Sequence, residues 1–120
     1  MSLAMRVYTK RIIEYSDARF KKMKDVCYDL FQKYIGEDFY ADDDGEGCEW
    51  EILRTSLQEL HDSLQNGEIT DEDLSKIMKK HPFEVEAMSI EYFREYFIKG
   101  IKYMLQTADP NHLCVYISWF

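Results

Sequence analysis

The stretch from Phe83 to Leu105 constrains the fold most, because it carries the most apolar bulk at the most regular spacing. Its apolar side chains recur mostly every three or four residues, the interval that stacks side chains on one face of a helix: Phe83, Ala87, Ile90, Phe93, Phe97, Ile101 and Met104. A continuous helix of this length would measure about 34 Å at 1.5 Å per residue, enough to span a small domain. We therefore expect a central core helix that begins at Phe83 or at Ser89.

Residues 17–35 show the same interval. Ser16 and Asp17 offer a helix cap and a favourable first-turn acid, and Gly36 is a typical residue just beyond a helix end. The apolar positions of this segment are Phe20, Met23, Cys27, Leu30, Phe31 and Tyr34. The pattern predicts one helix over residues 17–35.

Two shorter helical patterns lie between these segments. The first is a stripe of Trp50, Leu53, Leu57, Leu60 and Leu64, which Asn66-Gly67 ends. The second starts at Thr70, whose hydroxyl can cap a helix with acids in its first turn, and Pro82 stops it. Leu74, Ile77 and Met78 give this second helix an apolar face.

The helical patterns together predict an all-α, mainly helical fold: one domain over residues 1–120, built as a bundle of four to five helices. Residues 36–48 have three glycines, clustered acids and no period, so we expect an acidic loop there. The predicted core consists of Phe20, Met23, Cys27, Leu30, Phe31, Leu53, Leu57, Leu60, Leu74, Ile77, Phe93, Phe97, Ile101 and Met104.

The two ends of the chain have strand propensity. Residues 113–120, LCVYISWF, are short, apolar and rich in β-favouring residues, and they predict a strand. Its alternation places Leu113, Val115, Ile117 and Trp119 on one face and Cys114, Tyr116 and Phe120 on the other. A strand needs a partner for its backbone groups. The candidates are residues 5–15, which fit either a helix or a strand, or a second copy of the protein in a homodimer.

Composition narrows the class of protein. A chain of 120 residues with 46% hydrophobic content is large enough for a core of its own. We expect a cytoplasmic protein, because no apolar run reaches membrane-spanning length and no signal peptide is recognisable. Residues 1–4 resemble a cloning leader before Met5. The three cysteines form neither a disulfide framework nor a metal motif.

The net charge of −8 comes from one segment. Residues 37–51 contain eight acidic residues and no basic one, whereas acidic and basic residues balance in the rest of the chain. Phosphate binding favours a basic surface, so nucleic acid is not expected as the main partner.

The acidic segment partly matches a calcium-binding EF-hand loop. Asp42, Asp44, Glu46 and Gly47 fit loop positions one, three, five and six, but Leu53 stands at the twelfth position, where a bidentate Glu is required. Asp42, Asp44 and Glu46 are therefore weak metal candidates, and a solvated acidic loop is the favoured interpretation.

Catalysis is not expected, and no cofactor is implied. The three histidines, His61, His81 and His112, lie on different segments, and none is paired with another ligand at helical spacing. The sequence contains no phosphate-binding glycine loop and no nucleophile motif.

The sequence instead favours a small acidic protein that acts by protein–protein interaction, as an inhibitor, an immunity-type protein or a regulatory accessory protein. Acids interspersed with aromatic rings suit docking to a basic protein, because charge steers the encounter and rings anchor it. The predicted contact residues are Phe39, Tyr40, Asp42, Asp43, Asp44, Glu46 and Trp50. The alternatives are a divalent-metal-binding protein or a metal-assisted enzyme that uses the cluster at 42–51, and a loop that serves only solubility.

Overall fold

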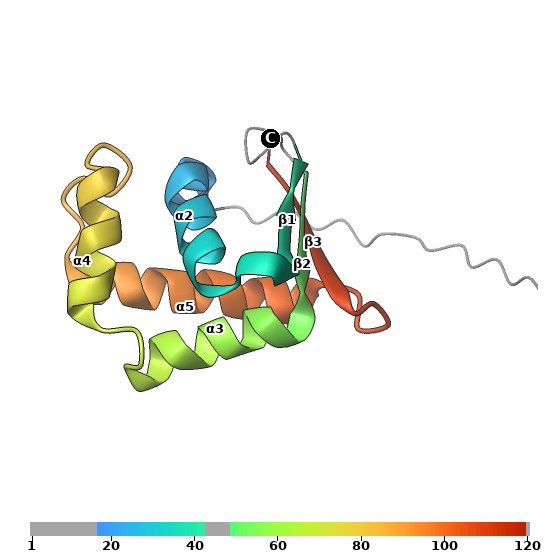
Figure 1. Cartoon of the computed structure of the whole chain (residues 1–120). Coiled ribbons are helices and arrows are strands. Elements are labelled where there is room, and N and C mark those ends of the chain that lie inside the picture. Colours follow the sequence, from blue (N-terminus) through green and yellow to red (C-terminus); the bar gives the residue numbers. More distant parts are fainter. Residues whose placement is uncertain (1–16, 43–48, 120) are drawn as a thin grey trace, which may run out of the picture.

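The computed structural model describes residues 17–42 and 49–119. Within these ranges the chain is mainly helical, as predicted, and it also forms a three-stranded antiparallel sheet (Figure 1). The helices are α1 (Ala18–Lys21), α2 (Lys24–Tyr34), the 3-10 helix η1 (Gly36–Asp38), α3 (Arg54–Asn66), α4 (Asp71–Lys80) and α5 (Ile90–Thr107). The strands are β1 (Phe39–Ala41), β2 (Glu49–Leu53) and β3 (Cys114–Ser118).

The helix α5 is the central element, and α3 and α4 both pack against it. Figure 1 shows α5 running from the α4 end of the molecule to the sheet. The helix begins after Ser89, whose hydroxyl accepts a hydrogen bond from the Tyr92 amide at 3.1 Å, so the later of the two predicted starts is the correct one. No helix within residues 17–42 and 49–119 combines the length and the apolar character needed to cross a bilayer.

The contact between α1 and α5 depends on a glycine. A Cβ atom at Gly100 would lie 2.6 Å from Cε2 of Phe20, so only glycine allows this aromatic ring to approach the helix so closely. The Phe20 ring also stacks on Trp119 at a centroid distance of 5.9 Å, and Trp119 meets Trp50 at 5.0 Å. The aromatic core is thereby continuous from α5 to the sheet.

The single helix predicted over residues 17–35 is instead two helices. The chain leaves helical geometry at Met23, which has φ −106° and ψ 27°, and α2 then begins at Lys24. Both Phe20 and Met23 are buried as a result. Asp17 caps α1 by accepting hydrogen bonds from the amides of Arg19 and Phe20, whereas the predicted cap Ser16 lies outside the described residues.

The sheet corrects the prediction for residues 36–53. Its strand order is β1-β2-β3, and the predicted C-terminal strand pairs with β2 over Glu49–Leu53. Residues 36–41 form η1 and β1 rather than a loop, and the helical stripe that was expected to begin at Trp50 begins only at Arg54. Residues 5–15, the predicted partner of the C-terminal strand, lie outside the described residues.

The predicted core is buried, except that Leu53 and Met104 are partly exposed. The largest error concerns Phe83, which is 92% exposed because it precedes α5 instead of lying on its buried face. The buried apolar residues that were not on the predicted core list include Val26, Phe39, Trp50, Ile52, Leu64, Ile69, Val85, Met88 and Val115.

Candidate functional site

The two faces of the sheet differ sharply in composition. Paired positions across the strands place Phe39, Ile52 and Val115 in one row and Ala41, Trp50 and Ile117 in another. These rows face the helices and are buried or nearly so. Because side chains alternate along a strand, the residues between them lie on the opposite face.

The outer face carries aromatic rings and carboxylates. Tyr40, Glu51 and Tyr116 form one row across the three strands, and Glu49 pairs with Ser118 in the next. Tyr40 is 64% exposed and Tyr116 is 39% exposed. We call these five residues the acidic sheet face.

No cation neutralises the carboxylates of the acidic sheet face within the described parts of the chain. None of the three strands contains Lys or Arg, and none of the ion pairs there involves Glu49 or Glu51. Arg54 follows β2 directly, but its guanidinium donates to the carbonyl oxygens of Leu105, Asp109 and His112. The unbalanced negative charge predicted from sequence thus extends onto an ordered surface.

Local polar contacts hold the carboxylates in place. Both Glu49 oxygens lie 2.9 Å from the Ser118 hydroxyl, and the Glu49 amide donates to Asp42 Oδ1 at 3.1 Å.

The Cys114 thiol lies close to a carboxylate of the acidic sheet face. Partial burial, together with the neighbouring Glu51 carboxylate, raises the pKa of the Cys114 thiol. A thiol in this environment is a poor nucleophile.

The structure separates the predicted contact residues into three groups. Tyr40 and Asp42 lie at the sheet, with Tyr40 exposed and Asp42 half-buried. Phe39 and Trp50 are core residues, only 7% and 1% exposed, so their interpretation as exposed anchors is wrong. Their rings pack edge-to-face at 5.1 Å. Asp43, Asp44 and Glu46 lie outside the described residues.

Sequence reasoning missed Glu51, Tyr116 and Ser118 as members of one surface. The signal was the alternation in residues 49–53, EWEIL, which matches that of residues 114–118, CVYIS. Alternation by itself does not identify which strands are neighbours, so the row of Tyr40, Glu51 and Tyr116 becomes visible only from the register.

The metal hypothesis gains no geometric support from the part of the chain that the structure describes. No group of three or more His, Cys, Asp or Glu side chains is placed there to hold a metal ion. Asp42 is the one predicted metal candidate within this part, and its Oδ1 accepts the Glu49 amide. Asp44 and Glu46 fall in the undescribed segment.

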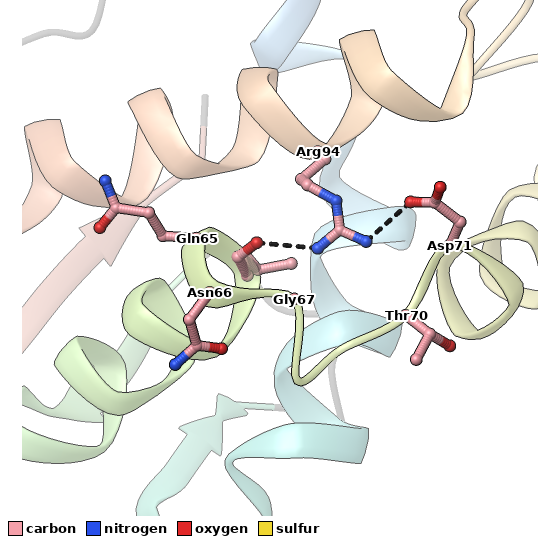
Figure 2. Close-up of a pocket in the computed structure, with 7 residues that line it drawn as sticks. Gln65, Asn66, Gly67, Thr70, Asp71 and Arg94 are labelled. Carbon is pink, nitrogen blue, oxygen red and sulfur yellow. Dashed lines mark hydrogen bonds and ion pairs between the residues drawn. The ribbon is translucent and has the colours of Figure 1, made fainter.

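A second polar location lies where α3, α4 and α5 meet. Figure 2 shows the Arg94 guanidinium between the end of α3 and the start of α4, where it donates to the Leu64 carbonyl and to Asp71 Oδ1, each at 2.8 Å. An open hollow of about 430 Å³ surrounds it, lined by Leu64, Gln65, Asn66, Gly67, Thr70, Asp71 and Arg94. Because Arg94 satisfies a helix-terminal carbonyl and a first-turn acid, its contacts fasten the α3–α4 connection.

Comparison of the chain with family models, with curated proteins and with solved structures finds no match.

Proposed function

We propose that the protein acts by binding a basic protein partner through the acidic sheet face. The observation that carries this proposal is the row of Tyr40, Glu51 and Tyr116, in which a carboxylate with no cationic partner among the described residues lies between two exposed rings. We retain the class of activity expected from the sequence, an inhibitor, an immunity-type protein or a regulatory accessory protein of the cytoplasm, and we propose no catalysis.

The row suits a basic side chain from the partner. Two strand spacings, about 9.5 Å in total, separate the backbones of Tyr40 and Tyr116. A guanidinium that enters between the rings would pair with Glu51 and lie near aromatic faces, which attract cations by about 0.5–1 kcal/mol at exposed sites. Arginine fits better than lysine, because its planar group can both stack and form two parallel hydrogen bonds.

Charge also governs the encounter. Asp42, Glu49 and Glu51 belong to the acidic segment of the sequence, and unbalanced charge on one face accelerates association with an oppositely charged surface. Tyrosines then provide anchoring area with little loss of side-chain freedom. The proposal therefore assigns the acids to the association rate and the rings to the lifetime of the complex.

A hexa-arginine peptide tests the site before any partner is known. Titration of the labelled protein should shift the amide resonances of Tyr40, Glu51 and Tyr116 first, and added salt should reverse the shifts. The double variant Glu49→Gln with Glu51→Gln should weaken these shifts. A matched control, Glu91→Gln with Glu95→Gln, removes the same charge from the exposed surface of α5 and should leave them unchanged.

Equal binding of the peptide by the two double variants would overturn the proposal. A partner isolated by affinity capture then provides the decisive measurement, because its association rate should fall in the sheet variant and depend less on salt. If the isolated protein is a second copy of this chain, the interaction is self-association. If Ca²⁺ or Mg²⁺ shifts the same resonances and the peptide does not, the metal alternative replaces the proposal.

A further inference from the structure

A histidine at the end of α4 faces two carboxylates, one from α2 and one from the loop that follows α4. His81 Nε2 lies 2.5 Å from Asp29 Oδ2 on α2, and His81 Nδ1 lies 3.4 Å from Glu84 Oε2. The side chains of His81 and Glu84 are 16% and 19% exposed, and that of Asp29 is 34% exposed. We call these three residues the histidine cluster.

The geometry of the histidine cluster favours an additional proton. A neutral imidazole has one N–H donor and one bare nitrogen, which acts only as an acceptor. Both ring nitrogens here lie near carboxylate oxygens, so a neutral ring with two ionised carboxylates would direct one lone pair at a negative oxygen. One further proton, on the ring or on a carboxyl group, removes that repulsion.

Glu84 also accepts a hydrogen bond from the first turn of α2. Its Oε1 accepts a hydrogen bond from the Val26 amide at 3.3 Å, in the first turn of a helix whose N-cap residue, Met23, provides no side-chain cap. Burial raises the pKa of the Glu84 carboxyl above its ordinary value. The nearby Asp25 carboxylate raises this pKa further, whereas the hydrogen bonds from the Val26 and Asp25 amides and the charge of His81 lower it. The net effect of these surroundings is a raised pKa of the Glu84 carboxyl, in the same direction as the geometric argument.

The charges around the cluster come from every neighbouring segment. From α2 it faces Asp25, Asp29 and the buried Cys27 thiol, whose pKa is raised by burial and by Glu84. From α4 it meets the negative end of the helix dipole, since His81 is the C-cap residue, with Lys80 adjacent in sequence. From α1, the Arg19 guanidinium reaches the same loop but donates to the Glu86 carbonyl at 2.6 Å.

The cluster fixes the loop between α4 and α5. Val85 and Met88 of this loop are buried, Ala87 has a positive φ of 61°, and Phe83 points outward. A non-glycine residue in the left-handed region is strained and persists only when its surroundings hold it. The contacts of His81 and Glu84 with α2 are among those that hold this loop.

We propose that a proton shared by Asp29, His81 and Glu84 latches residues 81–88 onto α2, and that loss of this proton as pH rises loosens the loop. A group whose pKa is higher in the folded than in the unfolded protein stabilises the fold, and this stabilisation is fully present below the unfolded-state pKa. That stability is lost as pH rises through the folded-state value, so the latch weakens from the ordinary glutamate range upward.

Nuclear magnetic resonance of the unmodified protein tests the latch. Between about pH 5 and about pH 9, the ring nitrogens of His81 report whether both carry protons. In the same samples, amide exchange corrected for its intrinsic pH dependence gives the protection of Val26 and of residues 84–88. We expect this protection to fall as the cluster loses its proton.

The pair formed by His61 and Asp62 is the internal control. His61 Nδ1 lies 3.1 Å from one carboxylate oxygen, Asp62 Oδ1, and no second carboxylate faces it among the described interactions. Protection of the amides around His61 should therefore change less than that of the loop. The variant Glu84→Gln keeps an oxygen for the Val26 amide but removes one carboxylate, so its loop protection should lose most of its pH dependence.

Two results would overturn the latch. One is a His81 ring that is neutral at a pH at which both carboxyls are ionised while the loop stays fully protected. The other is a Glu84→Gln variant whose loop protection follows pH as in the unmodified protein.

Discussion

The sheet end and the helical end of the molecule differ in whether their charged side chains have partners among the described residues. Where the helices meet, Arg94 bonds Asp71, His81 bonds Asp29, and Arg19 bonds the Glu86 carbonyl. On the outer face of the sheet, Glu49 and Glu51 lie beside tyrosines and a serine hydroxyl instead.

This difference separates charged side chains that stabilise the fold from charged side chains that can still bind a partner. A charge with a fixed partner in the same chain contributes to packing and to the orientation of helices. A carboxylate that the fold holds in place without a cation keeps its capacity to attract one. The comparison predicts large stability effects from residues on the inner face of the sheet and at helix junctions, and binding effects from the acidic sheet face.

The largest effect should come from removing β3. Deletion of residues 113–120 takes away a strand paired with β2, together with Trp119, and should abolish cooperative unfolding. Circular dichroism melts and sedimentation would measure this. A truncated protein that melts and sediments like the full chain would show that β3 contributes neither to folding nor to association with a second copy.

Trp50→Ala and Tyr40→Ala compare the two faces of the sheet directly. Trp50 is 1% exposed, and its loss should lower the free energy of unfolding by about 3–5 kcal/mol. Tyr40 is 64% exposed, and its loss should change that energy by about 0.5 kcal/mol or less. Denaturant titration of both variants checks the pair, and similar losses would contradict the assignment of the faces.

Arg94→Ala tests a paired charge at the helical end. It leaves the Leu64 carbonyl and Asp71 without their donor, and should lower the free energy of unfolding by about 1–3 kcal/mol. Arg94→Lys keeps the charge but lacks the two separate guanidinium nitrogens that donate to Leu64 and Asp71. Its free energy of unfolding should therefore lie between those of the alanine variant and the unmodified protein in the same titration. A neutral alanine variant would mean that this connection does not depend on the arginine.

Glu51→Gln should have the smallest effect on stability and a distinct chemical one. Because the Glu51 carboxylate adds to burial in raising the pKa of Cys114, its removal should increase the alkylation rate of that thiol at a given pH. Mass mapping of alkylated peptides distinguishes Cys114 from the other two cysteines. An unchanged rate would show that burial alone sets the reactivity.

Sequence periodicity located the helical segments, because each carries its own apolar stripe, but it missed the break at Met23 and placed the start of α3 too early. Thr70 and Asp73 form the capping box expected at the start of α4, and Gly67, with φ 84°, ends α3. These signals are local, so a single segment contains all the information needed.

The sheet and the candidate site depended on distant partners. Trp50 and Leu53 fit a helical stripe, but residues 49–53 also alternate as a strand, and the pairing of Trp50 with Ile117 and of Leu53 with Cys114 decides for the strand. Phe83 is a different case, because a local signal, the cap at Ser89, excludes it from α5. The histidine cluster joins residues more than fifty positions apart and left no motif in the sequence.

The contact between the two tryptophans has a spectroscopic consequence. Trp50 and Trp119 are the chain's whole complement of indole rings, and their centroids lie 5.0 Å apart. Intrinsic fluorescence will therefore report on one place, the junction of the sheet with α1, whereas far-ultraviolet dichroism averages over the helices. Unfolding curves from the two signals should coincide if the sheet and the helices melt as one cooperative unit. If the sheet detaches first, emission will change while the helical signal persists.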